Sequence, residues 1–306
     1  MPLSTNLRAA LFMSLSMAGF TANDAITKSV AQSMNMGQVM FVRGVFATLL
    51  IALLAWRSGA LASLRGSGHP LVVIRVAAEI GATVCFLVAL QNLPLATVSA
   101  VLQALPLAVT MGAALVFSEP VGWRRWLAIV AGFAGVLIIV RPGFEGFNAF
   151  ALLALLCVAF CAVRDLATKR IPASVPTLLV SAATSAAITM AGAALVQPFG
   201  GWTEMTGESG LLLFVAAMLL IVGYQFVILA MREGEISFVA PFRYTGLLWA
   251  ILLSFVVFND TPDLAMIIGA SLVVGSGLYA FYRERVRGRT LPAAESTGPA
   301  MAPDGL

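Results

Sequence analysis

Charged residues are scarce in this sequence. Only 10% of its 306 residues are Asp, Glu, Lys or Arg, whereas 60% are hydrophobic, and the mean hydropathy is +0.97. A soluble domain carries about 25% charged residues, so this chain lacks the groups that would cover a water-facing surface. The composition therefore excludes a soluble protein and indicates an integral membrane protein.

Side chains that commonly bind metals or act as nucleophiles are also few. The chain has three cysteines (Cys85, Cys157 and Cys161) and one histidine, His69. Because a cysteine pair without nearby histidine is a poor metal pattern, we interpret the cysteines as small buried residues and expect no metal and no cofactor. The net charge of +4 lies mostly in loops and the C-terminal segment, so we expect no nucleic-acid partner.

An intramembrane enzyme and a channel are the alternatives to a carrier. Ser67 and His69 superficially resemble a serine-protease element, but they are close neighbours in a loop and have no buried orienting partner. A channel would need rings of charge or a repeated filter, and the sequence shows neither. It also has no Gly-rich phosphate loop ending in Lys-Ser/Thr, which argues against ATP-driven transport. We therefore expect a carrier rather than an enzyme.

Continuous apolar runs close to 20 residues fill most of the chain, and this is the length of a membrane-spanning helix. Spanning strands would instead show alternating segments of about ten residues, so the pattern predicts an all-α fold. Short connections marked by Gly, Pro or charge leave no room for a soluble domain. Ten transmembrane helices are predicted, at residues 7–27, 38–56, 71–91, 95–117, 124–141, 148–166, 176–197, 210–231, 236–258 and 263–282.

One five-residue pattern occurs twice. The sequence DAITK at residues 24–28 returns 141 residues later as DLATK at residues 165–169, and each copy ends an apolar run. In the same register, FSE at 117–119 matches FND at 258–260. These matches predict two copies of one five-helix unit.

The predicted repeats cover residues 7–141 and 148–282, and a basic, then disordered, cytoplasmic tail follows at 283–306. Arg8 and the apolar run after it could also be a signal peptide, but the matching run at 148–166 lies in mid-chain. We therefore interpret the first run as a helix.

Lys and Arg are distributed unevenly between alternate loops. With the N-terminus inside, the inner loops and tail hold twelve of them, and the outer loops hold only Lys28 and Arg141. The positive-inside rule thus predicts a multi-pass protein of the cell inner membrane with both termini cytoplasmic. Since each repeat has an odd number of helices, the two repeats must be inverted, as in many secondary transporters with a substrate site near the midplane.

Seven charged residues fall inside predicted helices, not counting the residues at helix ends that are assigned to the loops. Each would cost about 2.5–3.5 kcal/mol at the bilayer centre, so they must be paired, hydrated or near an interface. Asp24 and Arg43 fall near the outer ends of the first two helices, and Arg164 and Asp165 near the inner end of the sixth. We predict that these two pairs act as gates; interfacial salt bridges are the alternative. The seven are Asp24, Arg43, Arg75, Glu79, Arg164, Asp165 and Arg243.

Arg75 and Glu79 lie one turn apart on the third helix and therefore share a face. Glu79 is about 12 Å along that helix, at 1.5 Å per residue. We predict that the two residues contact substrate or couple transport to protons; the alternative is a structural Arg75–Glu79 pair.

Prolines interrupt two of the predicted helices beside polar and aromatic residues. Pro106 and Pro241 each remove a backbone hydrogen bond and can bend a helix toward a cavity. We predict that neighbouring side chains form the walls of a substrate cavity: Gln103, Gln225, Arg243, Tyr244 and Trp249.

Glycines are grouped in the fifth and tenth predicted helices. In lipid, small residues allow helices to approach closely, so we expect these positions to form helix contacts. They include Gly132, Gly135, Gly269, Gly275 and Gly277.

Together these features resemble the drug/metabolite transporter superfamily, and its EamA group most closely, over residues 7–282. The resemblance rests on the inverted halves, on Arg43 and Arg75 at the start of their helices, and on the Ser-Glu-Pro sequence at 118–120. The second copy departs from the family's glutamate by having Asp260. The resemblance implies alternating access through a central cavity, driven by a gradient or by exchange.

A finer resemblance concerns the substrate. Residues 23–28 and 37–44 are similar to proteobacterial EamA members that import riboflavin, so riboflavin uptake is the favoured hypothesis. The alternative is export of amino acids or of related metabolites or drugs. We expect a small-molecule substrate and a monomer or homodimer in the lipid bilayer.

Overall fold

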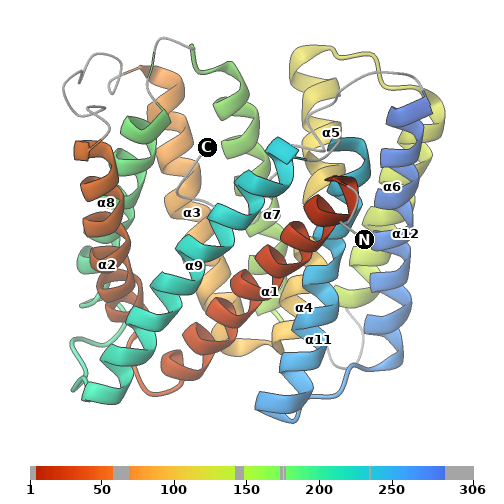
Figure 1. The fold of residues 1–306 in the computed structure, drawn as a ribbon. Helices are drawn as coiled ribbons and strands as arrows, with labels where there is room; N and C mark the ends of the chain where they lie inside the picture. The colour runs from red at the N-terminus through yellow and green to blue at the C-terminus, as the bar shows by residue number, and fades with distance from the viewer. Residues whose placement is uncertain are drawn as a thin grey trace.

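The computed structural model describes residues 5–57, 69–141, 148–172, 175, 177–233 and 236–286. Within these residues the fold is all-helical, and every one of the ten predicted segments is helical (Figure 1). Among the described residues, eight helical stretches are long and apolar enough to cross a membrane, two of which combine consecutive helices (Leu95–Phe117 and Ala240–Phe258), and α8 adds a shorter apolar stretch, Leu179–Leu195. The helices are α1 (Thr5–Ala31), α2 (Met36–Arg57), α3 (Pro70–Asn92), α4 (Leu95–Leu102), α5 (Leu105–Phe117), α6 (Trp123–Val140), α7 (Phe150–Arg170), α8 (Thr177–Leu195), α9 (Gly207–Glu233), α10 (Ile236–Val239), the 3₁₀ helix η2 (Ala240–Tyr244), α11 (Thr245–Phe258) and α12 (Leu264–Val286).

Two predicted helices are interrupted rather than continuous. The fourth is divided into α4 and α5 at residues 103–104, and the ninth into α10, η2 and α11. Pro106 follows the first break and Pro241 lies inside η2, at the second. Because proline cannot donate the helical hydrogen bond, both breaks lie where the backbone ladder is already weakened.

The helices pair in a pattern that is unchanged when the two halves are exchanged. Helix α1 packs on α9 as α7 packs on α3, while α2 pairs with α8 and α6 with α12. Helix α11 packs on α1 as α5 packs on α7. In Figure 1, α2 and α8 form one flank of the bundle, α6 and α12 form the other, and α1 and α9 run diagonally side by side at the front.

The backbone confirms the 141-residue register between the halves. Helices α5 and α11 end at Ser118 and Asn259, which have left-handed φ values of 53° and 55°. In each copy the next amide donates to a carbonyl six residues earlier, at 3.3 Å after Ser118 and 3.0 Å after Asn259. The two helices therefore end with the same left-handed residue and the same wide backbone turn at matching positions.

Glycines allow the closest helix contacts. In the α2–α8 pair, a Cβ on Gly44 would lie 2.6 Å from Thr189 Oγ1. In the α6–α12 pair, a Cβ on Gly135 would lie 2.6 Å from the carbonyl oxygen of Gly269. Gly275 differs from our expectation, because a Cβ there would meet nothing within 4 Å. It therefore faces open space instead of a neighbouring helix.

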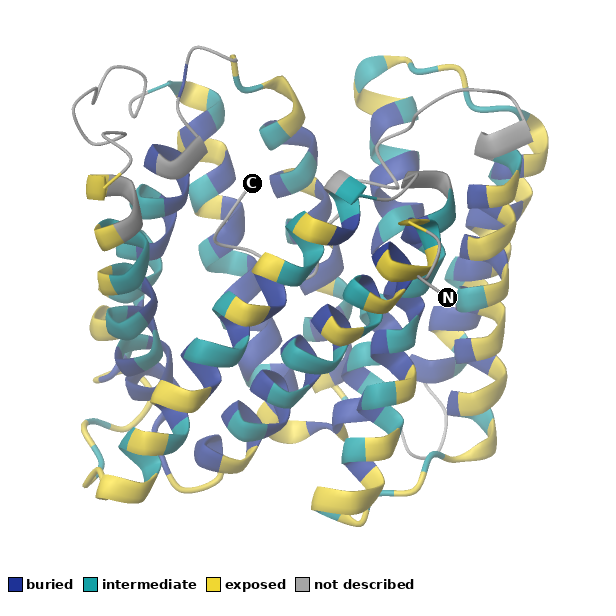
Figure 2. Cartoon of the chain, in the orientation of Figure 1, coloured by how far each residue is buried: buried dark blue, intermediate teal, exposed yellow. Residues whose placement is uncertain are grey.

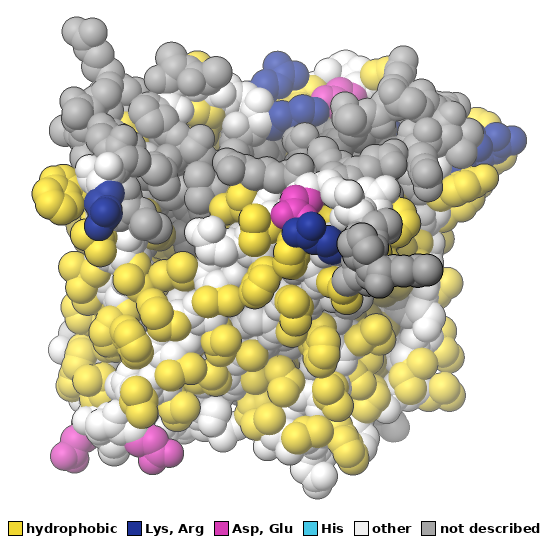
Figure 3. All heavy atoms as spheres, in the orientation of Figure 1, with side chains coloured by type: hydrophobic (Ala, Val, Ile, Leu, Met, Phe, Trp, Pro, Cys, Tyr) yellow, Lys and Arg dark blue, Asp and Glu magenta, His cyan; other side chains and the backbone are white. Residues whose placement is uncertain are grey.

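The molecular surface matches a membrane environment. Figure 2 shows exposed residues along the outward faces of the helices and buried ones facing the bundle interior. In Figure 3, hydrophobic side chains form a wide belt, with most Lys and Arg side chains at the upper edge and acidic ones also at the lower edge. This distribution identifies a multi-pass membrane protein; the 287–306 part of the predicted tail lies outside the described residues.

Candidate functional site

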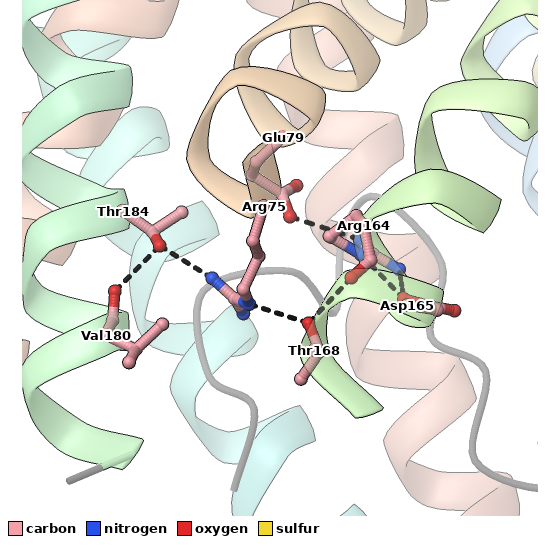
Figure 4. Close-up of polar contacts among 7 residues, drawn as sticks. All are labelled: Arg75, Glu79, Arg164, Asp165, Thr168, Val180 and Thr184. Atoms are coloured by element: carbon pink, nitrogen blue, oxygen red, sulfur yellow. Dashed lines mark hydrogen bonds and ion pairs between the residues drawn. The ribbon is translucent and has the colours of Figure 1, made fainter. Parts of the chain in front are cut away.

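A buried charge cluster lies where α3, α7 and α8 meet (Figure 4). At its centre is Arg164, only 1% exposed, whose Nη1 lies 3.3 Å from Oε2 of the fully buried Glu79. The same guanidinium binds Oδ1 of Asp165, through Nε at 2.7 Å and Nη2 at 2.6 Å. Two carboxylates from two helices are thus held by one arginine.

Arg75 extends this cluster to α8. Its Nε donates to Thr168 Oγ1 at 2.9 Å, and its Nη1 donates to Thr184 Oγ1 at 2.6 Å. Each threonine hydroxyl donates in turn to a carbonyl of its own helix at 2.7 Å, which fixes its orientation (Figure 4). We call these six residues the compensated cluster: Arg75, Glu79, Arg164, Asp165, Thr168 and Thr184.

The compensated cluster joins residues that the sequence placed in two separate groups. Arg164 and Asp165 were predicted as a gate, and Arg75 and Glu79 as substrate or coupling residues, but all four lie together. The ion pair of Glu79 is made with Arg164 on another helix, and Arg75 acts on the same carboxylate electrostatically. Because Arg75 and Glu79 come from the first half and the rest from the second, the cluster ties the halves together.

The two threonines were not predicted as site residues. Thr168 is part of the repeated DLATK sequence, and Thr184 matches Arg43 in the 141-residue register. That register was the signal that could have identified them, because it matches Thr168 with Thr27 of the repeated sequence and Thr184 with the charged Arg43.

The same register defines a second cluster where α1, α2 and α9 approach each other. Asn23 takes the place of Arg164, while Asp24 and Thr27 match Asp165 and Thr168. The positions of Arg75 and Glu79 become Ala216 and Leu220, so the arginine is supplied by α2 instead. We call this the counterpart cluster: Asn23, Asp24, Thr27 and Arg43.

The counterpart cluster is less completely bonded. Asn23 Nδ2 donates to Asp24 Oδ1 at 3.0 Å, and Arg43 acts on Asp24 electrostatically, but no ion pair joins these two described residues. Among the described residues, three of its buried atoms have no hydrogen-bond partner: Asn23 Oδ1, Thr27 Oγ1 and Arg43 Nη1. In the compensated cluster one buried atom of the described residues, Glu79 Oε1, has no hydrogen-bond partner. A buried polar atom without a partner costs about 1–3 kcal/mol, so within the described residues the counterpart cluster has the larger unmet hydrogen-bonding capacity.

The lysines of the repeated sequence each interact electrostatically with an acidic residue of the opposite half of the chain. Lys28 Nζ donates to the carbonyls of Leu90, in the last turn of α3, and Leu93, its C-cap, at 2.8 and 2.5 Å, and Asp260 of the second half acts on its charge. Its counterpart Lys169 forms an ion pair with Glu119 at 2.9 Å. Each lysine therefore lies near the acidic residue that follows the broken helix of the other repeat.

The remaining predicted residues are spread over the two broken helices and α9. Arg243 and Tyr244 are buried in η2, and Trp249 donates from Nε1 to the Ser14 carbonyl at 3.2 Å. Gln103, at the break between α4 and α5, has its Nε2 3.7 Å from the Cβ position of Gly246. The two breaks therefore approach one another.

Gln225 lies apart from this group. It is exposed on α9, on the same outward stripe as Val222 and Leu229. The structure thus does not bring it together with Gln103 or Arg243.

His69, the histidine of the enzyme alternative, has a structural contact. It is the N-cap of α3, where its Nδ1 accepts a hydrogen bond from the Leu71 amide at 3.3 Å. Ser67 lies outside the described residues.

Comparison with known proteins gives a consistent result. The chain matches the EamA-like transporter family over residues 7–141 and again over 148–282. It is 24% identical over 285 residues to an S-adenosylmethionine uptake transporter of Rickettsia prowazekii, covering 92% of this chain and 95% of the relative. It is 25% identical over 261 residues to a pseudopaline exporter of Pseudomonas aeruginosa, covering 83% and 89%.

A riboflavin transporter of Vibrio cholerae matches a shorter part. It is 30% identical over 176 residues, which cover 57% of this chain and 58% of the relative. A crystal structure with 20% sequence identity superposes with a TM-score of 0.61 over 92% of this chain and 99% of the other, which shows a shared fold.

Proposed function

The chain belongs to the EamA-like transporter family, and from that premise we propose that it is a secondary transporter that moves a small organic metabolite across the cell inner membrane by alternating access. The observation that supports this most directly is the contrast between the two clusters. They occupy matching positions in the two halves, yet among the described residues the compensated cluster is joined by ion pairs and has one unpartnered buried atom, whereas the counterpart cluster has three.

In this proposal residues 7–141 and 148–282 are the inverted repeats, and both termini are cytoplasmic. The compensated cluster then lies at the cytoplasmic end of α7 and acts as the inner gate. Because it joins α3 of one half to α7 and α8 of the other, the gate opens only if the Glu79–Arg164 contact and the two Arg75–threonine bonds separate. Asp24 and Arg43 form the opposite, outer gate.

Glu79 provides a way to couple this opening to protons. Its Oε2 faces Arg164, while its Oε1 has no hydrogen-bond partner among the described residues. A proton on Glu79 removes the charge that attracts Arg164 and leaves that arginine bound to Asp165. Protonation therefore weakens the tie between α3 and α7 without breaking the pair inside α7.

Two substrate hypotheses remain. Riboflavin uptake is supported by the sequence at residues 23–44 and by the riboflavin transporters among the relatives. An amino-acid-related metabolite, in either direction, is supported by the relatives that match the chain over a greater length. The donors and acceptors of Asn23, Thr27 and Arg43 are available to either substrate.

Uptake into proteoliposomes tests the function. Radiolabelled riboflavin and S-adenosylmethionine are offered separately, with and without an imposed proton gradient. We expect slow, saturable uptake of one compound, reduced by Arg43→Ala and unaffected by Ser67→Ala. Single-channel currents, or equal permeation of both compounds, would contradict a carrier. Growth of a riboflavin-auxotrophic host on low riboflavin checks the favoured substrate in cells.

A further inference from the structure

A groove of about 450 Å³ opens on the exposed surface of the α6–α12 pair, facing away from the bundle interior. It belongs to neither cluster, because none of its lining residues is part of them. Its walls are apolar except for Arg124, two serines and Tyr279.

The groove forms because α6 and α12 are close at one level and apart at another. At the close level, the Cβ positions of Gly135 and Gly269 each lie 2.5–2.6 Å from the other residue's carbonyl oxygen. Six residues further along α12, about 9 Å at 1.5 Å per residue, Gly275 lines the groove and a Cβ there would meet nothing. A side chain at residue 275 would therefore occupy the groove instead of colliding with α6.

The polar groups along the wall are satisfied internally. Ser271 Oγ donates to the Ile267 carbonyl at 2.7 Å, and Ser276 Oγ donates to the Val273 carbonyl at 2.9 Å. These hydroxyls need no hydrogen bond from an occupant, so this part of the groove suits a hydrocarbon chain.

One end of the groove carries positive charge and exposed aromatic rings. Arg124 is exposed and lies 5.0 Å from the centre of the Trp123 ring, and no acidic residue in the described part of the chain forms an ion pair with it. Arg283 lies one turn beyond Tyr279 on the same face of α12. Exposed Trp and Tyr side chains are typical of the headgroup level of a membrane, and basic pockets between helices on the cytoplasmic side bind anionic headgroups.

We propose that this groove binds an anionic glycerophospholipid, with one acyl chain along Gly275 and the headgroup phosphate at Arg124. The lipid joins α6 of the first half to α12 of the second on the side away from the gates. The site is independent of which metabolite the protein transports.

Native mass spectrometry of the intact purified protein tests this assignment. The protein is released from micelles containing equal amounts of phosphatidylglycerol and phosphatidylethanolamine, and the retained lipid is identified by mass. One lost surface charge changes the affinity for an anionic lipid about fivefold, so we expect Arg124→Gln to reduce retained phosphatidylglycerol by that factor. Gly275→Leu, which fills the groove, is expected to abolish retention of both lipids.

Gly275→Ala is the matched control for volume and Arg57→Gln, an exposed arginine at the end of α2, is the control for charge. Both are expected to retain phosphatidylglycerol like the unmodified protein, and thermal unfolding checks that all variants are folded. Equal retention by Arg124→Gln and the unmodified protein would overturn the proposal, as would retention by Gly275→Leu. A dimer that Gly275→Leu dissociates would also overturn it, since the occupant would then be a second copy of the chain.

Discussion

The compensated cluster and the counterpart cluster show how one backbone plan supports two different sites. Both have an aspartate and a threonine at matching positions of the first helix of a repeat. In the compensated cluster, the further arginine is Arg75 of α3, where it bonds two threonines. In the counterpart cluster it is Arg43 of α2, and the position of Arg164 is the neutral Asn23. The counterpart cluster thus has its arginine on α2 instead of α3 and a neutral residue in place of Arg164. Three of its buried polar atoms have no hydrogen-bond partner among the described residues.

This difference indicates that the residues shared by the two repeats specify the helix arrangement, whereas the residues that differ between them specify the transport function. A symmetric pair of clusters would favour opening at neither end over the other. The asymmetric pair gives one end a closed set of ion pairs and the other end groups that need a partner.

Replacing Arg164 should produce the largest effect. Arg164→Leu leaves Glu79 and Asp165 without their partner, and breaking a buried ion pair costs about 3–5 kcal/mol. Asn23→Leu changes the matching position of the counterpart cluster and removes a neutral group, so its cost should be clearly smaller. Thermal unfolding in detergent measures both; equal destabilisation by the two variants would remove the distinction between the clusters.

Glu79→Gln should separate coupling from transport. Since glutamine cannot carry the proton, gradient-driven accumulation is expected to fall to background while exchange of internal for external substrate persists. Glu79→Asp, which keeps the titrating group, should retain part of the accumulation. Unchanged accumulation by Glu79→Gln in proteoliposomes would end the proton-coupling hypothesis.

A pair of isosteric threonine changes compares the hydrogen bonding directly. Thr168→Val removes an acceptor from the buried Arg75 and should cost about 1–3 kcal/mol of stability. Thr27→Val removes a hydroxyl that has no partner among the described residues, so its cost should lie within about 0.5 kcal/mol of zero. Thermal unfolding of the two variants checks this order, and a larger cost for Thr27→Val would reverse the comparison.

The lysine contacts should contribute least. The Lys169–Glu119 pair is partly exposed, so Glu119→Gln should change stability by less than about 1 kcal/mol. Asp260→Asn, at the matching position, should also have a small effect because Lys28 keeps its two carbonyl partners. A large loss in either variant would show that these contacts are part of the clusters.

Much of the fold could be predicted from the sequence because the bilayer imposes it. Apolar runs of spanning length gave the helices, and the repeated sequences at 24–28 and 165–169 gave the register. The helix breaks at 103–104 and at η2 were signalled by Pro106 and Pro241, but how the backbone divides there depends on tertiary packing.

The composition of the site was harder to predict. Which of several buried charges pair depends on how α3, α7 and α8 are arranged around one another. Helical spacing within α3 could suggest only an Arg75–Glu79 pair as the structural alternative, because Arg164 comes from another helix. Gln225 shows the opposite case: a polar residue in an apolar helix suggested a cavity, whereas the outward stripe of α9 contains it.

Side-chain accessibility at the two clusters tests the gating proposal most directly. In a variant without native cysteines, Ser181→Cys lies one turn before Thr184, and Met40→Cys is the matching position one turn before Arg43; both sites are buried here. A membrane-impermeant maleimide is applied to each face of sealed vesicles, with and without Glu79→Gln. Our account predicts that Glu79→Gln speeds cytoplasmic labelling at residue 181 and slows external labelling at residue 40. Rates that change in the same direction, or not at all, would contradict it.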